Sequence, residues 1–231
     1  MSEEQTWAFS DAAGTGAAEE GQGMIWRIQQ ALREGLLEEA RASCEELRQQ
    51  EGREGEAEHL LGLVELRAGN YEQALARTRA AMELEAERAD VWANHGAAQA
   101  MAGRKEEAMG SLRRAVELDP EYEEALLNLG ALLLDAGWIQ EALTPLDQAI
   151  RIRPSARGFT LMASGLYASG NGESAATCAE AAYNLAPEDG ETCADLIRML
   201  SLVGHAEQAQ ALGERMSWQG PEKKRESFPQ A

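Results

Sequence analysis

Residues 89–122 read ADVWANHGAAQAMAGRKEEAMGSLRRAVELDPEY. The glycine, alanine and proline positions of this 34-residue stretch recur at a regular spacing along the chain. The recurring positions in this stretch are Gly96, Gly103, Ala108 and Pro120. Residues of the same kinds recur every 34 residues, or 33 at one step, at Gly35, Ala40, Gly62, Gly69, Ala74, Gly130, Gly137, Ala142, Pro154, Ala163, Gly170, Ala175, Pro187, Gly204, Ala209 and Pro221. This phase predicts six repeated units, at 21–54, 55–88, 89–122, 123–155, 156–189 and 190–223.

Each unit reads as two antiparallel helices. Apolar and small residues recur at helical spacing up to Gly103, which breaks the run. A second helix is predicted from Lys105 to Leu118, because Pro120 pushes the residue before it out of the α region. Gly96 and Ala108 are small where the two helices are expected to cross. Such a hairpin cannot bury its apolar face alone and must stack on its neighbours.

Composition agrees with an all-α fold. Alanine, the best helix former, is the commonest residue, and aromatics make up only 5% of the chain. The 231 residues carry 40 acidic and 21 basic side chains, for a net charge of −19. This charge repels phosphate backbones and anionic lipids, so nucleic acid and membrane surfaces are poor partners.

The compartment is expected to be the cytoplasm. The sequence has no basic and apolar leader of the secretory type and no apolar run long enough for membrane insertion. Its three cysteines, Cys44, Cys178 and Cys193, are an odd number without metal-like spacing. A bias toward Ala, Gly, Arg and Glu indicates a bacterial source.

The repeat resembles the tetratricopeptide repeat (TPR), a 34-residue helix–turn–helix with the pattern W-x-x-L-G…A…A…P. The clearest unit has Trp92-Ala93-Asn94-His95-Gly96, then Ala108, Ala115 and Pro120, and the next has Leu126-Leu127-Asn128-Leu129-Gly130, then Ala142, Ala149 and Pro154. The resemblance covers about 203 of 231 residues and weakens at both ends, where Ile28 and Ile197 replace the small crossing residue. It implies an all-α, right-handed α-solenoid of about six TPR units.

Two flanking segments and one proline depart from the pattern. Residues 1–20 are acidic and are expected to form a disordered tail, and residues 224–231 form a short basic tail. The array therefore spans residues 21–223. Pro145 falls inside a second helix, where we expect a mild kink rather than a break.

No catalytic constellation is found in the sequence. His59, His95 and His205 lack the partners of a metal-binding helix, and His95 occupies a packing position. Gly14-Thr15-Gly16 and Gly170-Asn171-Gly172 do not follow predicted strands, so neither indicates a phosphate loop. We expect no catalytic residue, no metal and no cofactor, and a protein that is not an enzyme.

The candidate site is a peptide-binding groove. The stripe of each first helix that is opposite its packing face should line the concave wall of the solenoid. By phase it consists of Glu56, His59, Leu63, Arg67, Asp90, Asn94, Ala97, Met101, Glu124, Asn128, Asp135, Arg157, Tyr167, Asp195 and Arg198. Concave TPR surfaces hold a peptide segment, and the resemblance implies the same here.

Asparagines and carboxylates refine this expectation. Asn94 and Asn128 share one phase and resemble the asparagine ladder of O-GlcNAc transferases, whose amides grip a peptide backbone. Chaperone-binding TPR proteins instead use a lysine-containing carboxylate clamp, and Glu56, Asp90 and Glu124 stand where its cations would be. A partner containing Lys or Arg is therefore favoured over one held by its C-terminal carboxylate.

Two functions follow from the resemblance. The first is a non-enzymatic interaction module: a TPR adaptor, scaffold or chaperone that binds a segment of a partner protein and is capable of self-association. The alternative is a TPR regulatory or substrate-recruiting domain that works with an enzyme such as a glycosyltransferase. Because the chain begins at Met and ends in a charged tail without a catalytic segment, the first function is favoured.

Overall fold

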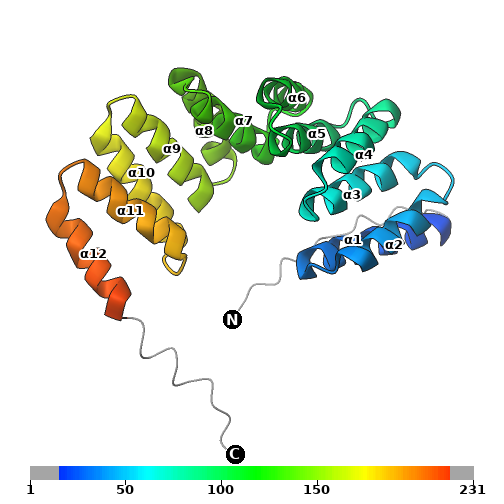
Figure 1. Cartoon of the computed structure of the whole chain (residues 1–231), viewed down its shortest axis with the longest axis horizontal. Helices are drawn as coiled ribbons and strands as arrows, with labels where there is room; N and C mark the ends of the chain where they lie inside the picture. Colours follow the sequence, from blue (N-terminus) through cyan, green and yellow to red (C-terminus); the bar gives the residue numbers. More distant parts are fainter. Residues whose placement is uncertain (1–15, 219–231) are drawn as a thin grey trace, which may run out of the picture. The chain divides into compact units, whose positions relative to one another are not determined.

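A computed structural model describes residues 16–218, which form twelve α-helices and no strand (Figure 1). The helices are α1 (Gly16–Glu34), α2 (Leu37–Arg48), α3 (Glu54–Arg67), α4 (Tyr71–Leu84), α5 (Ala89–Met101), α6 (Lys105–Leu118), α7 (Glu123–Asp135), α8 (Ile139–Ile152), α9 (Ala156–Ala168), α10 (Gly172–Leu185), α11 (Gly190–Leu202) and α12 (Ala206–Trp218). The all-α fold of six helical hairpins predicted from the repeat is confirmed.

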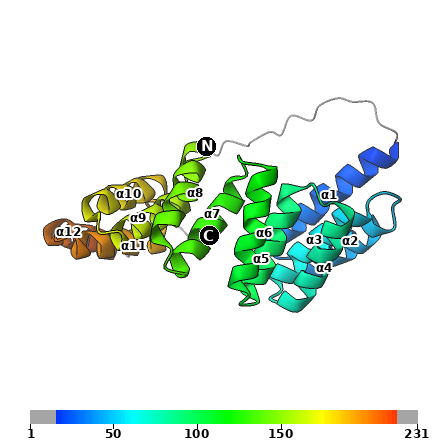
Figure 2. The same ribbon diagram turned by 90° about the horizontal axis from the view of Figure 1, so that it is seen from above.

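The chain divides into two compact units, residues 1–86 and 87–231. In the described residues the first unit holds α1 to α4, and the second holds α5 to α12. Consecutive helices pair into hairpins within each unit, and α9, α10, α11 and α12 lie side by side in both views (Figure 2).

Each hairpin turns at a glycine in the left-handed region of backbone conformation. Gly35, Gly69, Gly103, Gly137, Gly170 and Gly204 have φ between 76° and 90°. A residue with a Cβ pays roughly 1–2 kcal/mol there, whereas glycine does not. These are six of the recurring glycines of the sequence, so the predicted position of each turn is confirmed.

The two helices of a hairpin cross where a glycine removes the side chain. A Cβ on Gly96 would lie 2.8 Å from Cγ of Leu112 and 3.2 Å from the backbone oxygen of Ala108. A Cβ on Gly130 would lie 2.5 Å from Cδ2 of Leu146. These leucines are fully buried. The predicted crossing at small residues is therefore confirmed, because the second helix occupies the space that a larger residue needs.

In the middle of the chain the second helix of residues 89–122 ends where the proline of the repeat predicts. The second helix of residues 89–122 spans Lys105–Leu118, as predicted, and ends before Pro120. Helix α8 continues through Pro145, which is buried, so the helix is not broken. The mild kink stays a prediction.

The ends of the array differ in part from expectation. Helix α1 begins at Gly16, so residues 16–20, which were expected in the acidic tail, are helical. Ile28 is fully buried, and helix α1 extends the first hairpin beyond its predicted start. The disorder predicted for residues 1–15 and the basic tail at 224–231 lie outside the described residues.

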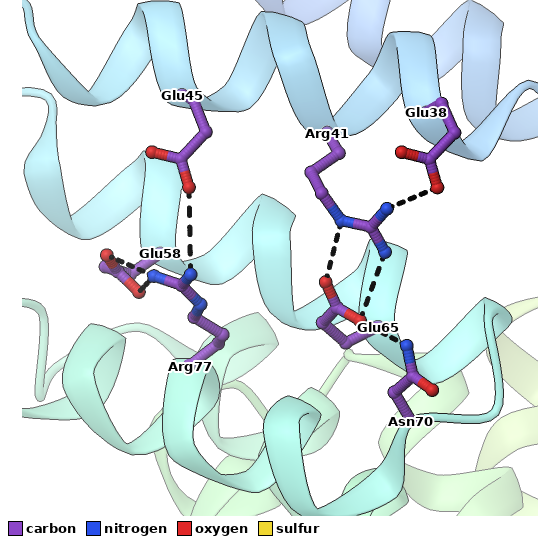
Figure 3. Close-up of polar contacts among 7 residues, drawn as sticks. All are labelled: Glu38, Arg41, Glu45, Glu58, Glu65, Asn70 and Arg77. Atoms are coloured by element: carbon purple, nitrogen blue, oxygen red, sulfur yellow. Dashed lines mark hydrogen bonds and ion pairs between the residues drawn. The ribbon is translucent and has the colours of Figure 1, made fainter.

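A polar network joins the helices of the first unit (Figure 3). Arg41 of α2 donates from Nε and Nη2 to the two carboxylate oxygens of Glu65 of α3, at 3.0 and 3.2 Å, and Asn70 donates to Glu65 at 2.8 Å. Glu65 is only 4% exposed. Burial raises the pKa of its carboxyl, but the hydrogen bonds from Arg41 and Asn70 outweigh this and hold the pKa below its ordinary value.

A second buried carboxylate lies two turns earlier on the same face of α3. Arg77 of α4 donates to both oxygens of Glu58 at 3.1 Å, and Arg48 of α2 donates to Glu58 at 3.3 Å. Glu45 of α2 lies 3.7 Å from Arg77 (Figure 3). Charge-assisted bonds therefore tie α3 to both α2 and α4. The apolar cluster around Leu61 and Val64 also joins α3 to α1 and α2.

Replacing Gly96 with Val should destabilise the second unit by about 1–3 kcal/mol, because the added carbons collide with Leu112 and with the backbone of Ala108. Gly110 of α6 is the control, since a Cβ there meets nothing within 4 Å. Gly110→Ala should stabilise by about 0.5–1 kcal/mol through helix propensity. Denaturant unfolding measures both, and equal effects of the same sign would refute the packing argument.

Replacing Arg41 with Met should destabilise the first unit by about 2 kcal/mol at pH 7, because a buried carboxylate loses its main partner while Asn70 remains. The loss should shrink as the pH falls below 4.5, the ordinary pKa of Glu65. The sign follows from linkage: the lowered pKa of Glu65 stabilises the fold above that pH, and this stabilisation is lost on acidification.

Unfolding at pH 7 and pH 4, with amide hydrogen exchange in α3 to locate the change, tests this claim. Arg151→Met is the control, because Arg151 is 77% exposed and, within residues 16–218, pairs only with Asp147 on the same helix. It should change stability by less than about 0.5 kcal/mol. An Arg41 variant that resembled this control at both pH values would show that the network is energetically neutral.

Candidate functional site

The first helices of successive hairpins form a layer in the second unit. Helix α7 contacts both α5 and α9, and α9 contacts α11. The second helices α6, α8 and α10 pack between consecutive members of this layer. We call α5, α7, α9 and α11 the first-helix layer. One of its faces packs against the second helices, so the stripe on its other face is available to a ligand.

Small and hydrogen-bonding side chains occupy the middle of this stripe. Ala97, Ala131 and Ser164 are half-buried at corresponding positions of α5, α7 and α9. Asn128 of α7 accepts a hydrogen bond through Oδ1 from Nη2 of Arg157 of α9, at 2.7 Å. This hydrogen bond joins two hairpins on the open side of the layer.

The predicted groove residues fall into three classes of exposure. Four lie on α3 in the first unit, and eleven lie on the first-helix layer of the second. The exposed members are Arg67, Met101, Glu124, Asp135, Arg157, Tyr167 and Arg198, the half-buried members are Glu56, Leu63, Asp90, Ala97, Asn128 and Asp195, and the buried members are His59 and Asn94. A ligand has least access to His59 and Asn94, which are 5% and 8% exposed.

The members on α3 take part in contacts within the first unit. Nη1 of Arg67 donates to the backbone oxygen of Leu32 at 2.7 Å and so caps the last turn of α1. Glu56 pairs with Arg53 at 2.6 Å. Arg67 therefore joins the first two hairpins, whereas the pair between Glu56 and Arg53 is local to the start of α3.

The acidic members of the second unit have different partners. Asp90 pairs with Arg88 at 2.6 Å, and Asp135 pairs with Lys105 of the preceding hairpin. Glu124 is exposed and accepts a hydrogen bond from the hydroxyl of Tyr122. Burial raises the pKa of Tyr122, and the carboxylates around it raise the pKa further. Of the three carboxylates, Glu124 is the one most open to a cation of a partner.

A shallow depression between α9 and α11 continues the stripe. Its walls include Thr160 and Ser164 of α9 and Asp195 and Arg198 of α11, and it encloses about 10 Å³. Such a volume holds about one water molecule, so this is a surface for contact rather than a pocket. Nη2 of Arg198 donates to Asp195 at 2.6 Å.

Sequence reasoning missed two residues beside the stripe. Thr160 lines the depression, although the predicted groove does not include it. Lys105 was missed because its bond to Asp135 joins two hairpins, which the repeat phase does not describe.

The cysteine thiols and the glycine-containing segment 170–172 contribute to packing and to a turn in the described residues. Burial raises the pKa of the Cys44 thiol to about 12, and it also raises those of Cys178 and Cys193. The thiols are therefore protonated and poorly nucleophilic at neutral pH. Asn171 caps α10 with its side chain, so the segment 170–172 is a turn, as predicted.

Residues 16–218 bring no three His, Cys, Asp or Glu side chains into a metal-binding group. None of the helices in this range is long and apolar enough to cross a membrane.

Comparisons with known proteins agree with this architecture. Residues 99–165 match the tetratricopeptide repeat family. No curated protein matches the sequence significantly. Solved structures match the fold at 18–20% identity, which is evidence of shared fold and not of shared function.

Three of these structures cover most of the chain. PilF of Pseudomonas aeruginosa is 20% identical, with a TM-score of 0.76 over 90% of this chain and 95% of its own. A thermophilic TPR protein of Thermus thermophilus is 18% identical, with a TM-score of 0.66 over 78% and 98%. YrrB, a TPR protein with an unusual peptide-binding site, is 20% identical, with a TM-score of 0.57 over 78% and 97%. The family match lies in the middle of the chain, and these neighbours share the helical-hairpin fold of tetratricopeptide repeat proteins over most of its length.

Proposed function

We propose that the open stripe of the first-helix layer binds a segment of a partner protein. In this proposal the protein is a cytoplasmic, bacterial adaptor, scaffold or chaperone and not an enzyme. TPR proteins are generally interaction modules, which supports the general class. The observation that carries the proposal is the row of Asn128, Arg157 and Arg198 on three adjoining first helices.

This row suits a peptide backbone for two reasons. Ala131 and Ser164 are small, so a main chain can approach the helices closely between the polar groups. Asn128 uses its oxygen for Arg157 and presents an amide nitrogen with two donors, and Arg157 carries further N–H donors. These donors match the carbonyl oxygens that an extended segment exposes.

The acidic side chains favour a partner that contains Lys or Arg. Glu124 is exposed at the end of the stripe where α7 begins. Asp90 and Asp135 add negative charge, although each already pairs with a basic side chain. We therefore expect the bound segment to place a cation near Glu124. The regulatory role beside a glycosyltransferase gains no support, because Asn94 of the asparagine pair that suggests it is buried.

A displayed library of 12-residue peptides, selected on the full chain, provides a ligand for the test. Selected peptides should be rich in Lys and Arg. Asn128→Ala/Arg157→Ala should weaken the best peptide at least about tenfold, because hydrogen bonds to charged groups contribute about 1.5–3 kcal/mol. Fluorescence anisotropy with labelled peptide measures the affinity.

The matched control also removes one side-chain amide and one arginine, but from a second helix. Gln140 and Arg151 of α8 are exposed, and Arg151 forms an ion pair with Asp147 of the same helix. Gln140→Ala/Arg151→Ala should leave the affinity within about twofold. Equal losses of peptide affinity in the two double variants, or no loss in either, would refute the stripe as the binding surface. An acidic consensus among the selected peptides would refute the preference for Lys and Arg.

A further inference from the structure

Each hairpin of the second unit exposes one large apolar side chain beside its turn. These residues are Met101, Trp138, Tyr167 and Leu202, which are between 40% and 56% exposed. They lie within three residues of the turn glycines Gly103, Gly137, Gly170 and Gly204. Single exposed apolar residues are normal, but one on every adjoining hairpin forms a surface that calls for an explanation.

Contacts between successive turns place these residues along one edge. Lys105, just after the α5–α6 turn, pairs with Asp135, just before the α7–α8 turn. A Cβ on Gly165, near the α9–α10 turn, would lie about 3 Å from Cδ2 atoms of Leu134 and Leu143, on either side of the α7–α8 turn.

The last two turns share a cavity. Tyr167 and Leu202, together with Val203, line an open hollow of about 270 Å³. We call the row of Met101, Trp138, Tyr167 and Leu202 the turn edge. It reaches across all four hairpins of the second unit.

A row of carboxylates accompanies the turn edge. The first turn of every second helix in this unit carries exposed glutamate, at Glu106 and Glu107 of α6, Glu141 of α8, Glu173 of α10 and Glu207 of α12. Glu173 lines the same hollow as Tyr167 and Leu202, and its Oε1 lies 3.5 Å from Nε2 of His205. Apolar and acidic groups therefore alternate along one edge of the unit.

We propose that the turn edge docks a basic amphipathic helix of a partner protein, with one apolar residue in every seven and Lys or Arg beside it. Contacting helices lie about 8–10 Å apart, and seven residues of an α-helix rise about 10.5 Å. A partner helix can therefore place one apolar side chain on each hairpin. Its Lys and Arg side chains then meet the glutamates.

The charge of the edge selects among possible occupants. A second copy of this chain carries a net charge of −19 and would bring acidic surface to acidic surface. An anionic bilayer is repelled in the same way. A basic helix gains both apolar burial and charge complementarity, and it contacts Trp138 and Leu202, which lie outside the predicted groove.

The probe is a synthetic 22-residue peptide with Leu at every seventh position, Lys beside each Leu, and Ala and Gln elsewhere. It should bind the full chain, and Trp138→Ser/Leu202→Ser should weaken it at least about tenfold. The control Ile152→Ser/Leu185→Ser removes two equally exposed apolar side chains from the far ends of α8 and α10. It should leave the affinity within about twofold.

Asn128→Ala/Arg157→Ala should leave this peptide unaffected, which separates the turn edge from the proposed peptide stripe. The proposal is overturned if a peptide of the same composition with its Leu residues spread around the helix binds as well. It is also overturned if both serine double variants lose affinity for the peptide equally. A third contradicting result is a dimer of the chain that Trp138→Ser/Leu202→Ser abolishes and that the peptide does not dissociate.

Discussion

The close crossing of the two helices in a hairpin is the constraint on which the rest of the structure depends. At Gly96 and Gly130 a buried leucine of the second helix fills the space next to the backbone of the first. A hairpin this tight leaves apolar surface on its flanks, which only another hairpin can cover. Stacking then aligns the first helices into a layer, and one face of that layer stays open. The candidate binding surface is thus a consequence of helix packing.

The two units add different forces to this common plan. In the first unit, Glu58 and Glu65 bind arginines from the neighbouring helices, so charge-assisted hydrogen bonds fix how the hairpins meet. In the second unit, alanines and leucines form the core, and polar contacts such as that between Asn128 and Arg157 lie on the open side. The second unit also has buried polar contacts, such as that between Ser111 and Gln99, but Asn128 and Arg157 lie where a ligand can reach them.

The sequence was sufficient for the architecture because glycine and proline have strict backbone requirements. The recurring glycines predicted six turns, and Pro120 predicted the end of α6. The site was harder to predict, because helical spacing predicts the face of a helix on which a side chain lies but not how exposed that side chain is to solvent. Asn94 and His59 lie at the expected spacing and are nevertheless buried. Met101 and Tyr167 were predicted as groove residues, but the turn edge as a whole was not predicted, because Trp138 follows its turn glycine whereas Met101, Tyr167 and Leu202 precede theirs.

The central claim is that the open stripe of the first-helix layer recognises a peptide segment. Chemical-shift mapping of the full chain with a peptide selected on it tests this claim most directly. We expect the largest amide shifts to cluster on α7, α9 and α11, around Asn128, Arg157 and Arg198. Shifts confined to the second helices α6, α8 and α10 would contradict it, because those helices would then carry the binding surface.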